Sequence, residues 1–96
     1  MHVISRRKLR EFWRRHSRGL RPLEEWYQTT RHAEWESFAD VKAAFPSADL
    51  YKRWVIFDIG GNKYRLIAVI HYDRQKVYVR YVLTHAEYDT DAWKNE

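Results

Sequence analysis

Apolar residues in the first half of the chain recur at intervals of three and four, the spacing of one helix face. They form two groups, Leu9, Phe12, Trp13 and His16, followed by Leu23, Trp26 and Tyr27. The first group predicts an amphipathic helix over 6–18 with Ser5 as its N-cap, arginines on its other side and a stop at Gly19. The second group predicts a helix with Pro22 in its first turn. A third, shorter helix is predicted between the capping-box sequence SFAD at 37–40 and Pro46.

From Arg53 onward the apolar positions alternate with a period of two, which is typical of strands. Strands are predicted over 54–59, 63–72 and 76–83, together with a short one over the first four residues. The segments 60–62 and 73–75 are the expected turns, and the sequence THAE at 84–87 should open a short terminal helical turn. The pattern predicts an α+β domain in which N-terminal helices pack on one face of a small, mainly antiparallel sheet.

Alternation along the second of these strands separates an apolar side from a partly basic one. The apolar side, which should face the helices, holds Tyr64, Leu66, Ala68 and Ile70, and the other side holds Lys63, Arg65, Ile67, Val69 and His71. The same rule in the next strand places Lys76, Tyr78, Arg80 and Val82 opposite Val77, Val79, Tyr81 and Leu83. Basic residues of two neighbouring strands are therefore expected on the face that the helices leave open.

Composition and charge narrow the class of protein. The 96 residues suit a single small domain, and the 5 Trp, 7 Tyr and 4 Phe argue against disorder. The absence of Cys excludes disulfides and thiol chemistry. The sequence contains no apolar run of membrane-spanning length and no signal-peptide pattern at its start, so we expect a cytoplasmic protein.

The net charge of +5 comes from two separate basic segments. Residues 1–35 hold nine basic and four acidic residues, mainly through the first helix, and residues 52–80 hold seven basic and two acidic ones. A basic, aromatic sheet face is suited to a phosphate backbone and a stacked base. The simpler interpretation, a solvated face of a half-buried sheet, also fits the alternation.

Groups that transfer protons near neutral pH follow the third long strand at once. His85, Tyr88 and Asp89 arrive at the end of the same sheet that carries the basic residues. Arginines near such groups would hold a phosphate and stabilise the negative charge that develops in phosphoryl transfer. The five His residues show no metal-ligand spacing, and no P-loop or nucleophile elbow is present, so we expect neither a metal nor a cofactor.

Three segments together resemble the HigB branch of the RelE-like toxins of bacterial type II toxin–antitoxin systems. They are FDIGGNKYRL at 57–66, VYVR at 77–80 and THAEYD at 84–89. The order of the preceding elements is similar too. The resemblance implies a single RelE-like toxin domain over 1–96. It also implies a ribosome-dependent endoribonuclease that cuts translated mRNA in the ribosomal A site. The implied inhibitor is a HigA-type antitoxin with a helix-turn-helix DNA-binding domain.

The resemblance further implies the reaction and the residue roles. The RNA 2′-hydroxyl attacks the adjacent phosphate without a metal ion and leaves a 2′,3′-cyclic phosphate and a 5′-hydroxyl. The expected catalytic residues are Arg65, Arg80 and Lys63 at the phosphate and His85 and Tyr88 in proton transfer or nucleotide positioning. The expected RNA-binding residues are Lys76, Tyr78 and Asp89, of which Asp89 also orients His85. Where relatives often have Asn, this chain has Asp58, whose effect on RNA stays open.

Two further interpretations remain at this point. The same basic face suits an RNA-binding module that cleaves nothing, and the aromatic content suits an interaction protein without an RNA role. The basic first helix is expected to contact ribosomal RNA or, more simply, to be a solvated face.

Overall fold

The computed structural model describes residues 1–95 and shows four α-helices and a five-stranded sheet in that part of the chain. The helices are α1 (Arg6–Arg15), α2 (Leu20–Arg31), α3 (Phe38–Ala44) and α4 (His85–Asp89), and the 3-10 turns are η1 (Ser17–Gly19), η2 (Tyr72–Arg74) and η3 (Ala92–Asn95). The strands are β1 (His2–Ile4), β2 (Asp49–Tyr51), β3 (Trp54–Ile59), β4 (Tyr64–His71) and β5 (Lys76–Thr84). Their order in the sheet is β1-β5-β4-β3-β2, with β1 parallel to β5 and the other pairs antiparallel. The predicted α+β class is confirmed.

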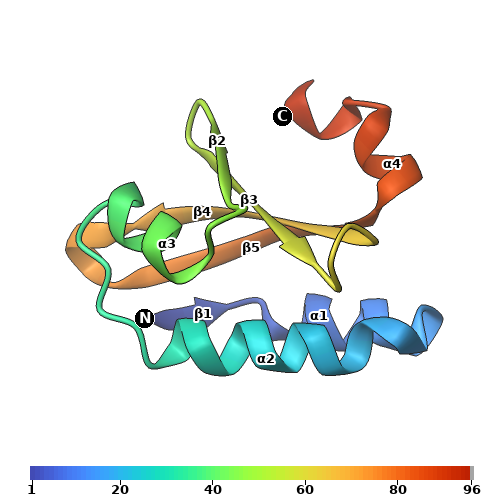
Figure 1. The fold of residues 1–96 in the computed structure, drawn as a ribbon, viewed down its shortest axis with the longest axis horizontal. Helices are drawn as coiled ribbons and strands as arrows, with labels where there is room; N and C mark the ends of the chain where they lie inside the picture. Colours follow the sequence, from blue (N-terminus) through green and yellow to red (C-terminus); the bar gives the residue numbers. More distant parts are fainter. Residues whose placement is uncertain (96) are drawn as a thin grey trace.

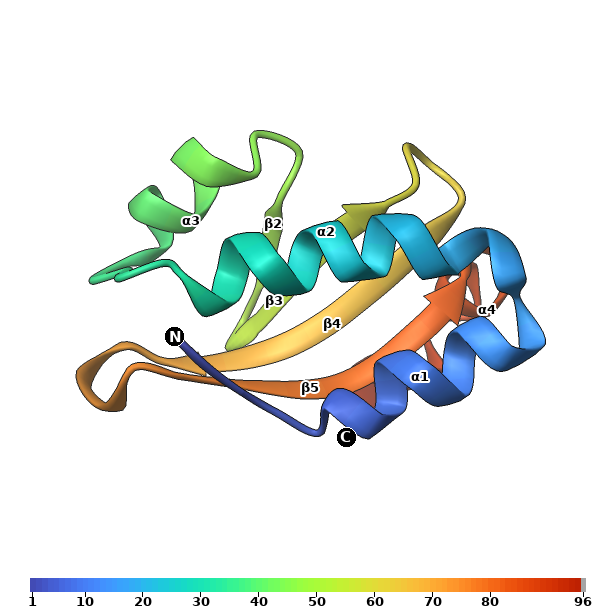
Figure 2. The same ribbon diagram turned by 90° about the horizontal axis from the view of Figure 1, so that it is seen from below.

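Helices α1 and α2 lie along one face of the sheet, and the C-terminal segment lies on the other side (Figure 1). Seen from below, α1 and α2 both cross in front of the strands, and α3 sits beside β2 (Figure 2). We call the face opposite α1 and α2 the outer face. It is the face on which the basic residues were expected.

The amphipathic first helix forms as predicted, but its N-terminal boundary differs in detail. Leu9 and Phe12 are buried, and His16 stacks on Phe12 with ring centroids 4.6 Å apart. Ser5 precedes the helix with φ at 72°, a left-handed conformation, and its side chain caps nothing. The predicted N-cap bond is therefore wrong. The helix also ends at Arg15, before the short turn η1.

The capping box predicted at 37–40 forms only in part. The Ser37 side chain makes no cap bond, while the Asp40 carboxylate accepts a hydrogen bond from the Glu36 N–H at 2.8 Å. Asp40 therefore accepts from the backbone N–H of Glu36, one residue before the Ser37 N–H that a capping box would use. Helix α3 still ends before Pro46, and its Val41 is fully buried.

The hairpin between β3 and β4 fixes the register on which the candidate site depends. Gly60 and Gly61 have φ of 65° and 72°, which residues with a side chain rarely adopt. The turn brings Ile59 opposite Tyr64 and, one pair further along, Asp58 opposite Arg65. An acid and a base thus face each other directly across the two strands.

Strand β5 departs from simple alternation because it contains a β-bulge. Ile67 pairs with Tyr81 whereas its neighbour Ala68 pairs with Val79, so Arg80 is the extra residue. A bulge shifts the side-chain pattern by one position. The placement of Lys76, Tyr78 and Arg80 on the outer face agrees with the prediction. The predicted placement of the residues beyond the bulge was wrong. Tyr81 and Leu83 join the outer-face cluster, and Val82 packs toward the helices.

The central strands are buried on both faces. The larger core lies between the sheet and the helices and includes Phe12, Leu23, Trp26, Phe57, Leu66 and Val77. A smaller core on the outer face consists of Trp54, Ile56, Ile67 and Trp93. Trp93 comes from η3, so the C-terminal segment covers part of the face that was expected to be open. Strand β2, an edge strand, was not predicted from the sequence.

Two leucines, one in the central strand β4 and one in the edge strand β2, test this assignment of the core. Leu66 is fully buried in β4, whereas Leu50 in β2 is 48% exposed. We expect Leu66→Ala to lower the free energy of unfolding by about 2–5 kcal/mol, since it leaves a cavity. Leu50→Ala should change it by less than about 0.5 kcal/mol. Urea unfolding measures both, and equal effects of the two substitutions would contradict the core assignment.

Candidate active site

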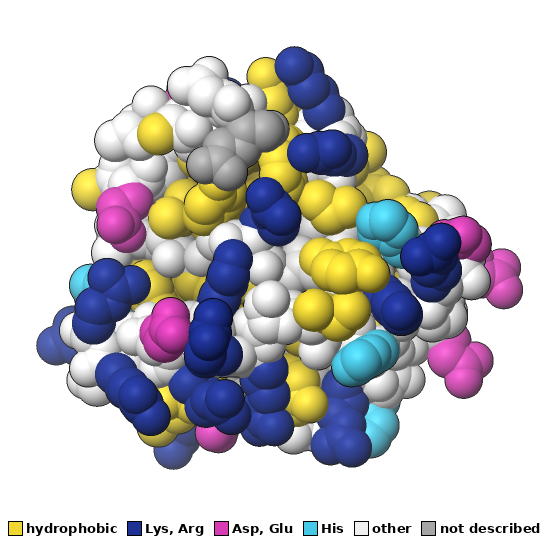
Figure 3. Space-filling model, turned by 180° about the vertical axis from the view of Figure 1, so that it is seen from behind, with side chains coloured by type: hydrophobic (Ala, Val, Ile, Leu, Met, Phe, Trp, Pro, Cys, Tyr) yellow, Lys and Arg dark blue, Asp and Glu magenta, His cyan; other side chains and the backbone are white. Residues whose placement is uncertain are grey.

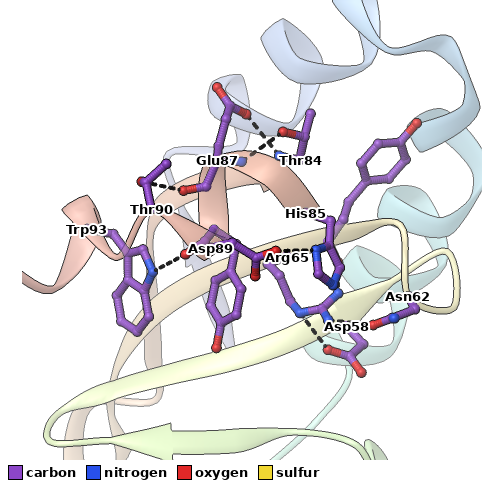
Figure 4. Close-up of polar contacts among 11 residues, drawn as sticks. Asp58, Asn62, Arg65, Thr84, His85, Glu87, Asp89, Thr90 and Trp93 are labelled. Carbon is purple, nitrogen blue, oxygen red and sulfur yellow. Dashed lines mark hydrogen bonds and ion pairs between the residues drawn. The ribbon is translucent and has the colours of Figure 1, made fainter.

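Arg65 is the anchored base of the candidate site. Its residue exposure is 8%, and its Nε lies 3.1 Å from Asp58 Oδ1. One terminal nitrogen donates to the Tyr64 carbonyl at 3.1 Å, and the other donates to Asn62 Oδ1 (Figure 4). Three of the five guanidinium N–H donors are used in this way, which leaves one on each terminal nitrogen. The group is held rigidly and still offers a fork of two donors.

Helix α4 presents His85 and Asp89 one helical turn apart. His85 Nδ1 lies 2.8 Å from Asp89 Oδ2 (Figure 4). With Nδ1 turned to the carboxylate, the other ring nitrogen, Nε2, is left for a substrate. The family resemblance implied that Asp89 orients His85, and the structure shows the contact between the two side chains.

A complete capping box fixes the start of α4. The Thr84 hydroxyl accepts from the Glu87 N–H at 3.2 Å, and the Glu87 carboxylate accepts from the Thr84 N–H at 2.9 Å. This backbone hydrogen bond holds the pKa of Glu87 below its ordinary value. The His85 N–H donates to the Lys63 carbonyl at 3.2 Å, which ties the helix to the turn before β4. The predicted capping box at 84–87 is confirmed.

Tyr88 lies between the anchored arginine and the C-terminal segment. Its ring centroid is 5.2 Å from Arg65 Cζ and 5.4 Å from the Trp93 ring, on which it stacks. The Trp93 indole N–H donates to the Tyr88 carbonyl at 3.2 Å. Burial raises the pKa of Tyr88 above its ordinary value of 10, and the positive charge of Arg65 opposes that rise. The hydroxyl is therefore a neutral proton donor near pH 7.

The structure brings only part of the predicted set together at this end of the sheet. Arg65, His85, Tyr88 and Asp89 form one group, and Lys63 is next to it with an exposed side chain. Arg80, Tyr78 and Lys76 lie on the same face but further along β5. Arg80 precedes Leu83, the partner of Arg65, by three residues, about 10 Å of strand. Its guanidinium lies over the Trp54 ring at 5.8 Å.

Three residues that shape the site were not assigned to it from the sequence. Asp58 and Asn62 hold Arg65, and Trp93 holds Tyr88. The hairpin contained a usable signal for Asp58, because a four-residue connection between Ile59 and Tyr64 sets Asp58 opposite Arg65. Nothing local in the sequence indicates that Trp93 folds back on the sheet.

The side chains of the site can bind an anion and transfer protons. Among residues 1–95, no three His, Asp or Glu side chains are grouped as ligands of a metal ion would be. Arg65 can bind an anion, the imidazole of His85 can take up a proton, and the Tyr88 hydroxyl can donate one. No helix in residues 1–95 combines the length and apolar character that a membrane span requires.

A helix-covered, mainly antiparallel sheet with an arginine, a histidine and a tyrosine grouped at one end is what the RelE-like toxins are expected to show. Comparison with known proteins agrees. The HigB toxin family, described as the RelE-like toxic component of a toxin–antitoxin system, matches residues 20–91. The chain belongs to this HigB toxin family.

Individual relatives match nearly the whole chain. The mRNA interferase HigB of Escherichia coli O6:H1 is 30% identical over 92 residues, which cover 93% of this chain and 89% of the relative. The mRNA interferase toxin HigB of Escherichia coli K12 is 32% identical over 92 residues, covering 93% and 88%. The mRNA interferase HigB of Shigella flexneri gives the same figures.

Two substitutions at one position test the anchoring of Arg65. Asp58→Ala leaves a nearly buried guanidinium without its carboxylate partner, and we expect a loss of about 1–3 kcal/mol in the free energy of unfolding. Asp58→Asn keeps an oxygen acceptor opposite Nε and should lose less. Thermal and urea unfolding of the two variants give the comparison. If Asp58→Ala is as stable as the parent, the ion pair does not anchor Arg65.

Proposed function

We propose that this chain is the toxin of a type II toxin–antitoxin pair and stops growth by cutting mRNA during translation. The observation that carries the proposal is the group formed by Arg65, His85 and Tyr88, in which a fixed cation suited to a phosphate lies beside two side chains that can transfer protons. The printed names of the relatives, mRNA interferase, support RNA as the substrate. Family membership implies an antitoxin, which we propose is a HigA-type helix-turn-helix protein.

The proposed reaction uses the RNA's own 2′-hydroxyl as nucleophile and needs no metal ion. His85 Nε2 takes the proton from the hydroxyl, and the 2′-oxygen bonds to phosphorus. The bond from phosphorus to the 5′-oxygen breaks, and the Tyr88 hydroxyl supplies the proton to the leaving oxygen. The products are a 2′,3′-cyclic phosphate and a 5′-hydroxyl. The proton that His85 takes up is matched by the proton that Tyr88 gives, so the RNA gains and loses no proton overall.

The arginines would supply the electrostatic part of this reaction. The phosphorane-like transition state carries one more negative charge than the bound phosphate. Arg65 is already oriented by its ion pair with Asp58 and by two hydrogen bonds, so little reorganisation is needed when that charge develops. Lys63 and Arg80 are proposed to add positive charge from either side, and Asp89 keeps His85 in the required tautomer.

The basic side of α1 is proposed to contact ribosomal RNA. Six of the ten residues of α1 are Lys or Arg. Figure 3, seen from behind, shows a dense group of Lys and Arg side chains at the lower left, where α1 lies. Ribosomal RNA is a large polyanion, and the basic surface of α1 would attract its phosphate groups.

The first test compares two histidines during induced expression in bacterial cells. His85→Ala should lower cleavage by about 10²–10⁴-fold and relieve growth arrest, because a proton-transfer group is lost. His32→Ala is the matched control, since His32 is exposed at the C-cap of α2. Mapping of mRNA 5′ ends measures cleavage, and co-purification with the antitoxin checks folding. An active His85→Ala toxin would contradict the assignment.

The second test addresses the ribosome and the RNA-binding alternative. Two reporter mRNAs, identical except for the presence of a start codon, are expressed together with the toxin. We expect new 5′ ends, in register with codons, on the translated reporter alone. Equal cleavage of both reporters would refute dependence on the ribosome. Intact reporters accompanied by growth arrest would instead favour a module that binds RNA without cutting it.

A further inference from the structure

A hollow lies on the outer face, further along the sheet from the group around Arg65. It is lined by Arg53, Trp54, Val69, His71, Tyr78 and Arg80 and has a volume of about 240 Å³. Pockets for drug-sized ligands are larger, at roughly 300–1,000 Å³. The hollow therefore suits one ring system and its attached group rather than a whole small molecule.

The lining combines aromatic rings with cations. Trp54 is 2% exposed and forms the floor, with Arg53 Cζ at 4.8 Å and Arg80 Cζ at 5.8 Å from its ring centroid. His71 and Tyr78 meet edge to face at 5.0 Å with an interplanar angle of 65°. Arg53, His71 and Arg80 are all exposed residues.

We propose that this hollow binds one nucleotide of single-stranded RNA. The base stacks against His71 and Tyr78, and the adjoining phosphate lies between Arg53 and Arg80. The proposal rests on the proposed function, since it adds a second contact for the same RNA. Aromatic side chains flanked by arginines are the chemistry that binds single strands with little dependence on sequence.

The spacing of the two sites along the sheet fits one extended strand of RNA. Tyr78 pairs with Val69, and Leu83 pairs with Arg65. Five residues of β5 separate these pairs, about 16 Å at the rise of a strand. Both sites lie on the same face of the same two strands, so an RNA running along β4 and β5 meets them in succession.

The bulge in β5 contributes to the second site directly. Because Arg80 is the extra residue, its side chain shares the outer face with Tyr78 and Tyr81. Lys8 from α1 donates to the Arg80 carbonyl at 2.9 Å, which holds the bulged backbone in place. The main alternative occupant, an acidic peptide, would use the arginines but has no base to stack on the rings of His71 and Tyr78.

The test measures binding apart from cleavage. A short 2′-O-methyl RNA lacks the nucleophile and cannot be cut, so fluorescence anisotropy with the full chain reports its Kd. We expect Tyr78→Ala to raise Kd about 5- to 150-fold, the range of one lost base stack. Tyr78→Phe retains the ring and should stay within about twofold of the parent. His71→Ala should weaken binding in the same direction as Tyr78→Ala.

The salt dependence of Kd tests whether an arginine of the hollow contacts an RNA phosphate. One phosphate contact to a single strand contributes about 0.7 to the slope of log Kd against log salt concentration. Arg53→Ala should reduce the slope by that amount. Arg31→Ala, an exposed arginine in the last turn of α2, is the matched control and should leave the slope unchanged.

The outcomes separate this proposal from the proposed function. An unchanged Kd in Tyr78→Ala and His71→Ala, or an equal loss in Tyr78→Phe, overturns the nucleotide site. Loss of antitoxin binding with unchanged RNA binding also overturns it and identifies a protein-docking surface. His32→Ala, the exposed control at the C-cap of α2, should bind the oligonucleotide like the parent. If the parent cuts no mRNA in cells while Tyr78→Ala still loses affinity, the proposed function fails and the nucleotide site stands.

Discussion

A guanidinium with a residue exposure of 8% is stable only when its charge and its donors are satisfied, and Arg65 meets that condition through the hairpin that precedes it. Asp58 supplies the opposite charge, and Asn62 and the Tyr64 carbonyl take up terminal donors. All three lie within seven residues of Arg65, so the anchor forms with the hairpin itself. Tyr88 then packs on Arg65, and Trp93 packs on Tyr88. The ion pair that fixes Arg65 therefore supports the C-terminal segment, together with the capping box of α4 and the apolar cluster that contains Trp93.

The same chain of contacts explains why the outer face is divided into two sites. Trp93 joins Trp54, Ile56 and Ile67 in one buried cluster, which makes the middle of this face apolar. Polar side chains remain on either side of the covered region, around Arg65 and around Arg80. An RNA lying along the sheet would meet a buried, fixed arginine at one end and exposed, adaptable arginines at the other.

Local patterns predicted the elements well wherever neighbouring residues determine the structure. The helical spacing of Leu9 and Phe12 and the alternation through β4 both correspond to observed faces. The capping box at Thr84 formed because both of its partners lie in the same turn. The grouping of His85 with Asp89 followed from a spacing of one helical turn.

The failures share a dependence on distant residues. Strand β2 has three residues, too few for a periodic signal, and exists because Leu50 and its neighbours pair with β3. The bulge at Arg80 carries no glycine and is held by Lys8, 72 positions away in the sequence. From the sequence, Trp93 is simply a residue near the C-terminus, and only its ring contacts with Tyr51 and Tyr88 show that it packs on the sheet. Because the bulge sets which residues of β5 face outward, alternation alone placed Tyr81 and Leu83 on the wrong side and hid the division of the outer face into two sites.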